Sequence, residues 1–71
     1  MRIKFMCGEK KVSAKIDTGN DAFYNGVNYD PDAEIDLIRM KIQGKINSGE
    51  VDGKCMDSNG NTVGSWRIIK G

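Results

Sequence analysis

Histidine is absent from this chain, and cysteine stands at two positions, Cys7 and Cys55. Without histidine the chain lacks the side chain whose ordinary pKa suits acid–base catalysis near neutral pH. The sequence also lacks a phosphate-binding glycine loop, a nucleophile elbow and a dinucleotide fingerprint. We therefore expect a protein that is not an enzyme, with no catalytic residue and no cofactor-binding residue.

A metal site is disfavoured by the same composition. Two cysteines without Cys-x-x-Cys spacing do not supply a closed zinc shell. The segment that starts at Asp57 departs from a calcium loop, because Thr62 and Ile68 stand where that loop requires Gly and Glu. Both cysteines fall on the apolar sides of predicted strands, which favours two buried thiols, with a disulfide between the hairpins as the alternative. We expect no metal and no cofactor.

Long apolar runs are missing as well. No stretch approaches the roughly 20 apolar residues of a membrane span, and Met1–Phe5 contains no apolar core of a signal peptide. Seventy-one residues, 38% of them hydrophobic, predict one small domain over residues 1–71 with a modest core. We expect a cytoplasmic protein without a membrane partner, for which a homodimer is one possible source of added stability.

Charge is present in abundance, and it is segregated along the chain. Six carboxylates and no cation lie between Asp17 and Ile38, whereas the sixteen preceding residues carry five cations and one acid. The residues after Ile38 carry six cations and three acids. The formal net charge of +1 therefore conceals one acidic block between two basic blocks. Such segregation is typical of a binding surface, although it does not identify the partner.

Residues 1–16 predict a β-hairpin. Apolar and polar side chains alternate on both sides of Gly8-Glu9, and a two-residue type II′ turn takes glycine first. This register pairs Phe5 with Val12 on an apolar face. The other face gathers four cations, Arg2, Lys4, Lys11 and Lys15.

Residues 51–68 predict a second hairpin around Asn59-Gly60, a pair typical of a type I′ turn. Folding there gives two faces, of which the first is the better core face because Trp66 lies opposite Gly53. The predicted pairs of the first face are Val51 with Ile68, Gly53 with Trp66, Cys55 with Gly64 and Asp57 with Thr62. Those of the second face are Asp52 with Arg67, as an exposed ion pair, Lys54 with Ser65 and Met56 with Val63.

Between the hairpins the pattern predicts a helix from about Pro31 to Ser48. Asp30 suits the N-cap, Pro31 suits the first helical position, and Gly49 suits the C-terminal end. The helical period places four isoleucines in one stripe, which we expect to pack on the sheet: Ile35, Ile38, Ile42 and Ile46.

A second apolar stripe runs along the opposite side of this helix, through Ala33, Leu37, Met40 and Gly44. One helix on one sheet needs one such stripe. Two explanations stay open: the segment with Phe23, Tyr24 and Tyr29 covers the second stripe, or Leu37 and Met40 form a dimer contact.

The segment 18–29 is also open between two conformations. Asn25-Gly26 closes a third, very short hairpin, or the segment is a loop that its aromatic residues hold against the core. The predicted fold is α+β in the order ββ-α-ββ, with one helix packed on a mostly antiparallel sheet of about four strands.

Two functional hypotheses follow from the charge pattern. The first is a non-catalytic protein-binding module, an inhibitor or adaptor that covers a basic surface of its partner. In size and charge pattern the chain is similar in kind to small accessory proteins of phages and mobile elements. Its candidate residues are Asp21, Tyr24, Tyr29, Asp30, Asp32 and Asp36. The alternative is a nucleic-acid-binding domain that uses Arg2, Lys4, Lys11 and Lys15 of the first hairpin.

Overall fold

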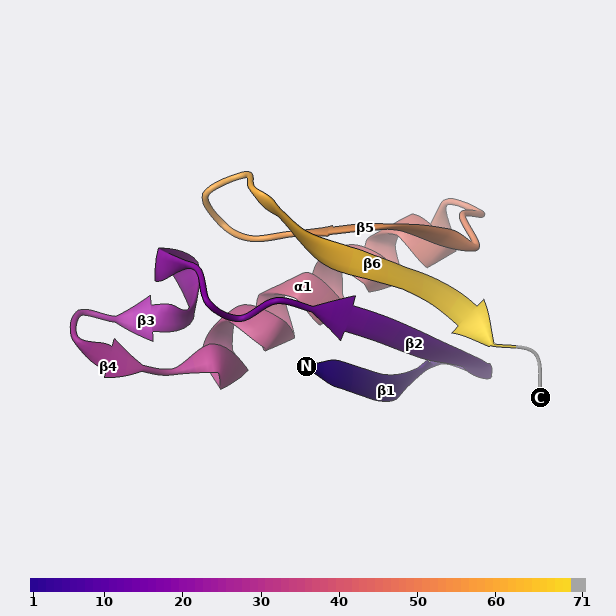
Figure 1. Cartoon of the computed structure of the whole chain (residues 1–71). Coiled ribbons are helices and arrows are strands. Elements are labelled where there is room, and N and C mark those ends of the chain that lie inside the picture. Colours follow the sequence, from indigo (N-terminus) through magenta and orange to yellow (C-terminus); the bar gives the residue numbers. More distant parts are fainter. Residues whose placement is uncertain (70–71) are drawn as a thin grey trace.

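A computed structural model describes residues 1–69 of the chain. One helix, α1 (Pro31–Asn47), packs on one face of a four-stranded antiparallel sheet (Figure 1). The strands are β1 (Arg2–Cys7), β2 (Lys10–Ile16), β5 (Asp52–Met56) and β6 (Thr62–Ile69), in the spatial order β1-β2-β6-β5. The predicted α+β class and the packing of the helix on the sheet are confirmed.

The first hairpin has the predicted register, with Phe5 opposite Val12 and Arg2 opposite Lys15. Gly8 has a φ of 64°, and no residue other than glycine has a positive φ within the described part of the chain. A type II′ turn requires positive φ at its first central residue alone, so Gly8-Glu9 closes the hairpin as expected.

The second hairpin confirms the pairs Gly53–Trp66 and Cys55–Gly64. Beyond Cys55 the register shifts, because Met56 lies opposite Thr62. The predicted pairs Met56–Val63 and Asp57–Thr62 are therefore wrong.

The turn of this hairpin explains the shift. Gly60 has a φ of 85°, but Asn59 has a negative φ, so the turn is not type I′. Asp57 is instead buried inside the turn, and its carboxylate accepts hydrogen bonds from the backbone N–H groups of Asn59 (3.0 Å) and Asn61 (2.8 Å). An aspartate side chain that binds nearby backbone N–H groups competes with the ladder and widens the loop.

Helix α1 ends one residue before the predicted boundary, with Ser48 as C-cap. Gly49 has a φ of 95°, and Glu50 donates its backbone N–H to the carbonyl of Lys45 (3.0 Å), the pattern of a Schellman motif. At the other end Asp30 occupies the N-cap, but its side chain makes no capping hydrogen bond. The predicted position of Asp30 at the N-cap is confirmed.

The core lies between α1 and the inner face of the sheet. The four isoleucines of α1 are buried as predicted, with Ile38 and Ile42 each 1% exposed. Trp66 reaches across its neighbouring strand at Gly53, where a Cβ atom would lie 2.9 Å from the indole Nε1. The residues of the sheet that join this core include Val12, Ala14, Ile16, Cys55, Val63 and Trp66.

The segment 18–29 combines both predicted conformations. A short 3-10 turn, η1 (Asp21–Phe23), inserts Phe23 fully into the core. Two-residue strands, β3 (Tyr24–Asn25) and β4 (Asn28–Tyr29), then form a small hairpin beside the start of α1 (Figure 1). The tyrosines of this hairpin are exposed, because they pair with each other and Phe23 alone is the aromatic anchor.

The second apolar stripe of α1 is not covered by this segment. Leu37 is 45% exposed and Met40 is 69% exposed. The first of the two explanations is therefore wrong, and Leu37 and Met40 as a dimer contact stay a prediction.

The cysteines lie on the two outermost strands of the four-stranded sheet, Cys7 on β1 and Cys55 on β5. Three strand spacings of about 4.8 Å place them about 14 Å apart, twice the distance that a disulfide spans. Both thiols are buried and free, and burial raises the pKa of Cys55. The disulfide alternative is excluded by the strand order.

Neither α1 nor the 3-10 turn, the helical segments of residues 1–69, is long and apolar enough to cross a membrane.

Candidate functional site

The outer face of the four-stranded sheet carries a concentration of cations. The side chains that alternate with the buried ones point away from α1, and the long basic ones among them are exposed. We call this surface the basic sheet face. It carries six cations, Arg2, Lys4, Lys11, Lys15, Lys54 and Arg67, and one acid, Asp52.

Four of these cations were predicted as a group, and the structure keeps them together on β1 and β2. Lys54 and Arg67 join them because β6 pairs with β2, which places Ser13 opposite Arg67 and Lys15 opposite Ser65. Alternation within residues 52–69 indicates that Lys54 and Arg67 share a face. However, no pattern of neighbouring residues indicates that the second hairpin pairs with the first.

The centre of the basic sheet face is hollowed. Ser13 and Ser65 are small, and the taller cations around them border a shallow depression of about 510 Å³. Arg2, Lys15 and Arg67 line this depression together with the serines and with one acid, Asp52. The arrangement offers cationic groups and backbone-adjacent hydroxyls to a ligand that carries several negative charges.

The cations of the basic sheet face have no acidic partner within the described residues. The one ion pair of residues 1–69 joins Asp36 and Arg39 (3.5 Å) on the helix, so the predicted Asp52–Arg67 ion pair does not form. Arg2 lies directly opposite Lys15, and like charges in that position are destabilising. An anionic ligand would relieve this repulsion.

The predicted acidic surface lies around the start of α1 and the small β3–β4 hairpin beside it (Figure 1). Asp21, Asp30, Asp32 and Asp36 are all exposed there, so the structure brings the predicted carboxylates to the surface. The rings of Tyr24 and Tyr29 lie beside this region with their centroids 5.2 Å apart, and the Tyr29 hydroxyl is hydrogen-bonded to Thr18. We call these six residues the acidic end.

Glu34 is the one acid of the first helical turn that does not belong to the acidic end. It is 6% exposed, and it accepts hydrogen bonds from the backbone N–H (2.6 Å) and the hydroxyl of Ser58. Asp57 accepts a further hydrogen bond from the side chain of Asn20 (2.9 Å). This polar cluster joins the segment 18–29, the start of α1 and the β5–β6 loop, and sequence reasoning missed it.

The hydrogen bonds of this cluster also set the charge of Asp57. Burial raises the pKa of Asp57, but hydrogen bonds from Asn61, Asn20 and Asn59 together lower the pKa below its ordinary value. Asp57 is therefore a carboxylate at neutral pH. Because its carboxylate oxygens already accept these hydrogen bonds, Asp57 stabilises the conformation of the β5–β6 loop.

Metal ligation finds no support in side-chain geometry within residues 1–69, where no three His, Cys, Asp or Glu side chains lie close enough to share an ion.

Comparison of the chain with protein-family models, curated proteins and solved structures finds no match.

Proposed function

We propose that this protein binds duplex nucleic acid through the basic sheet face. The observation that supports the proposal is the set of six exposed cations on a sheet face that no helix covers (Figure 1). Lysine and arginine that neutralise phosphates release condensed counterions, which supplies most of the affinity of sequence-independent binding. This reverses the order of the two hypotheses drawn from sequence, because Lys54 and Arg67 extend the basic surface beyond the first hairpin.

A duplex suits this surface better than a single strand. Single-strand binding proteins stack bases on exposed aromatic side chains. The strands β1, β2, β5 and β6 contribute a single aromatic pair, Phe5 and Trp66, and both side chains belong to the inner face. Cations and serine hydroxyls, as at Ser13 and Ser65, are the groups that contact the phosphate backbone.

The acidic end does not oppose this binding, because α1 lies on the opposite face of the sheet from the cations. The residues of the acidic end belong to η1, the β3–β4 hairpin and the start of α1, so they lie outside the basic sheet face. The charge segregation of the sequence becomes a segregation between different elements of the molecule.

The test is a fluorescence anisotropy titration of a labelled 20-base-pair duplex with the protein and with the variant Arg2→Glu/Lys15→Glu. We expect the variant to bind at least about tenfold more weakly at low salt. The slope of log affinity against log salt is negative, and removal of two phosphate contacts should make it shallower by about 1.8.

The matched control is Asp30→Lys/Asp32→Lys, which changes two charges at the acidic end. It should bind the duplex at least as tightly as the unchanged protein. Absence of a complex at about 50 mM salt, or equal affinity of the protein and the Arg2→Glu/Lys15→Glu variant, would contradict the proposal.

The acidic end supports a second candidate function, a contact with a basic protein surface. The observation that favours it is the exposed pair Tyr24–Tyr29 beside Asp30 and Asp32, because tyrosine is enriched where protein interfaces have their strongest contacts. In this function the chain acts as an inhibitor or adaptor, similar in kind to a phage accessory protein. Asp30→Lys/Asp32→Lys should abolish capture of a basic host protein without changing the circular dichroism spectrum.

We also propose a cytoplasmic site of action. The support is the pair of free thiols, Cys7 and Cys55, since chains of oxidising compartments usually pair their cysteines.

A further inference from the structure

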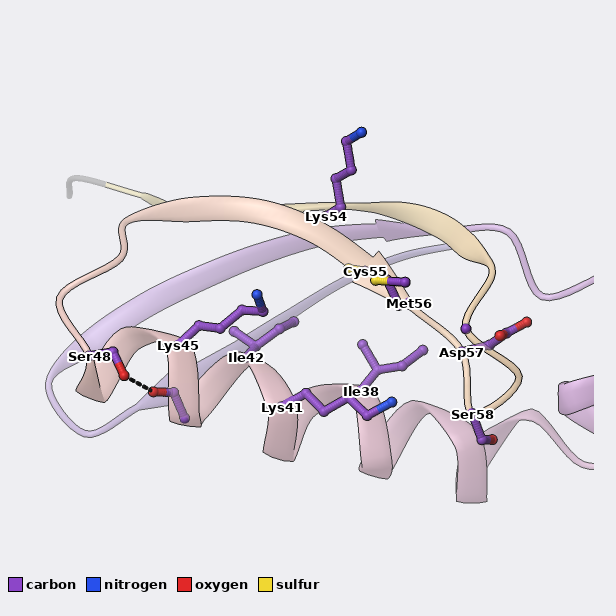
Figure 2. A pocket seen from close by; sticks show the side chains of 12 residues that line it. Ile38, Lys41, Ile42, Lys45, Ser48, Lys54, Cys55, Met56, Asp57 and Ser58 are labelled. Carbon is purple, nitrogen blue, oxygen red and sulfur yellow. Dashed lines mark hydrogen bonds between the residues drawn. The ribbon is translucent and has the colours of Figure 1, made fainter.

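A groove runs between α1 and the edge strand β5, on a different part of the molecule from the hollow of the basic sheet face. Its volume is about 490 Å³, and its floor is apolar (Figure 2). Ile38 and Ile42 of α1 and Cys55 of β5 form this floor. We propose that the groove binds an extended acidic peptide segment of a partner protein, which adds to β5 as a fifth strand of the sheet.

The free edge of β5 supplies the backbone groups for this addition. Ile68 donates its backbone N–H to the carbonyl of Val51 (2.9 Å), so these two residues form a hydrogen-bonded pair of the ladder. Hydrogen-bonded and non-hydrogen-bonded pairs alternate in antiparallel sheets. Gly53 and Cys55 therefore bond to β6, whereas Lys54 directs its N–H and C=O to the open edge.

Figure 2 shows the consequence for Lys54. Its side chain points away from the groove, yet Lys54 is one of the residues that line the groove, which places its backbone at the border. A strand that lies along β5 can hydrogen-bond with this backbone and turn alternate side chains toward the apolar floor. The edge is open to such pairing because β5 is the last strand of the sheet.

The charges around the groove select an acidic segment. Lys41 and Lys45 border it from successive turns of α1, and the side chain of Lys54 lies where the outward side chains of an added strand would meet it. The one acid among the lining residues is Asp57, whose carboxylate already accepts hydrogen bonds from Asn20, Asn59 and Asn61. Opposite charges across such a contact set partner choice.

The test uses three blocked heptapeptides of the same length: alternating Val and Glu, alternating Val and Lys, and the Val-Glu peptide with methylated backbone nitrogens. Each is titrated into ¹⁵N-labelled protein, and amide shifts are followed by NMR. We expect the Val-Glu peptide to shift amides of β5 and of α1 near Lys41, and the other two to bind at least about tenfold more weakly.

Two protein variants separate backbone from side chain. Lys54→Pro removes the N–H at the free edge, where proline is tolerated in a sheet, and should weaken Val-Glu binding about tenfold. Lys54→Ala keeps that N–H and loses the side-chain charge alone, so it should weaken Val-Glu binding less than Lys54→Pro does. Lys41→Glu/Lys45→Glu should weaken peptide binding while duplex binding by the basic sheet face stays unchanged.

Shifts confined to regions outside the groove, no shifts up to about 1 mM peptide, or equal binding of the methylated peptide would overturn the proposal. The duplex titration does not depend on any of these peptide results. The proposal of duplex binding and the proposal of peptide binding can therefore fail separately.

Discussion

At the scale of single residues, three glycines experience different surroundings although each looks alike in the sequence. A Cβ at Gly64 would overlap the backbone carbonyl oxygen of Lys15, and one at Gly53 would lie 2.9 Å from the indole nitrogen of Trp66. Gly44, in the middle of α1, has no atom within 4 Å of such a Cβ beyond its own helix. Glycine is thus required at Gly64, favoured at Gly53 and unfavourable at Gly44.

The corresponding alanine variants should differ in sign. Gly44→Ala should stabilise the protein by about 1 kcal/mol, because alanine loses less backbone entropy in a helix. Gly53→Ala should destabilise it by about 1–3 kcal/mol through overpacking against Trp66, and Gly64→Ala by about 3 kcal/mol or more because backbone must move. Urea denaturation followed by circular dichroism measures all three, and a stable Gly64→Ala variant would refute the β2–β6 packing.

At the scale of elements, two buried carboxylates hold the β5–β6 loop: Glu34 binds it to α1, and Asp57 binds it to the segment 18–29. Glu34 and Asp57 are both buried, and Ser58 donates two hydrogen bonds to Glu34. A carboxylate with several donors is retained inside a protein because its hydrogen bonds offset the loss of water. The loop therefore depends on the charged form of Asp57.

Acid should weaken this attachment. The pKa of Asp57 is lower in the folded protein than in the unfolded chain, so its contribution to stability is present above the unfolded value of about 4 and is lost as pH falls through the folded value. We expect the urea midpoint to decrease below about pH 4 and Asp57→Asn to show a smaller decrease. Asp30→Asn is the matched control, since Asp30 is exposed and makes no capping hydrogen bond. An identical acid limb in the protein and Asp57→Asn would contradict this role.

At the scale of the whole molecule, two surfaces of opposite charge lie on different elements. The sheet presents cations on the face that α1 does not cover, and the acidic end lies around the start of α1. Leu37 and Met40 are exposed on α1. In such an arrangement a polyanion and a basic partner can approach from different sides. Salt should weaken duplex binding steeply, whereas the groove, with its apolar floor, should respond less to salt.

The features that the sequence alone determined are those that depend on interactions between residues close together in the chain. Strand alternation, the Gly8-Glu9 turn, the isoleucine stripe and the C-terminal glycine of α1 depend on residues a few positions apart, and all four were predicted. Backbone sterics and side-chain period act at that range, so they can be recognised without knowledge of the fold.

Tertiary structure alone decided the rest. The pairing of β2 with β6 brings Lys54 and Arg67 to the basic sheet face, and it places β5 at an open edge beside α1. The burial of Glu34 and Asp57 likewise depends on segments more than twenty positions apart. Contacts of that kind depend on how all the elements pack together. A pattern of neighbouring residues does not specify that packing.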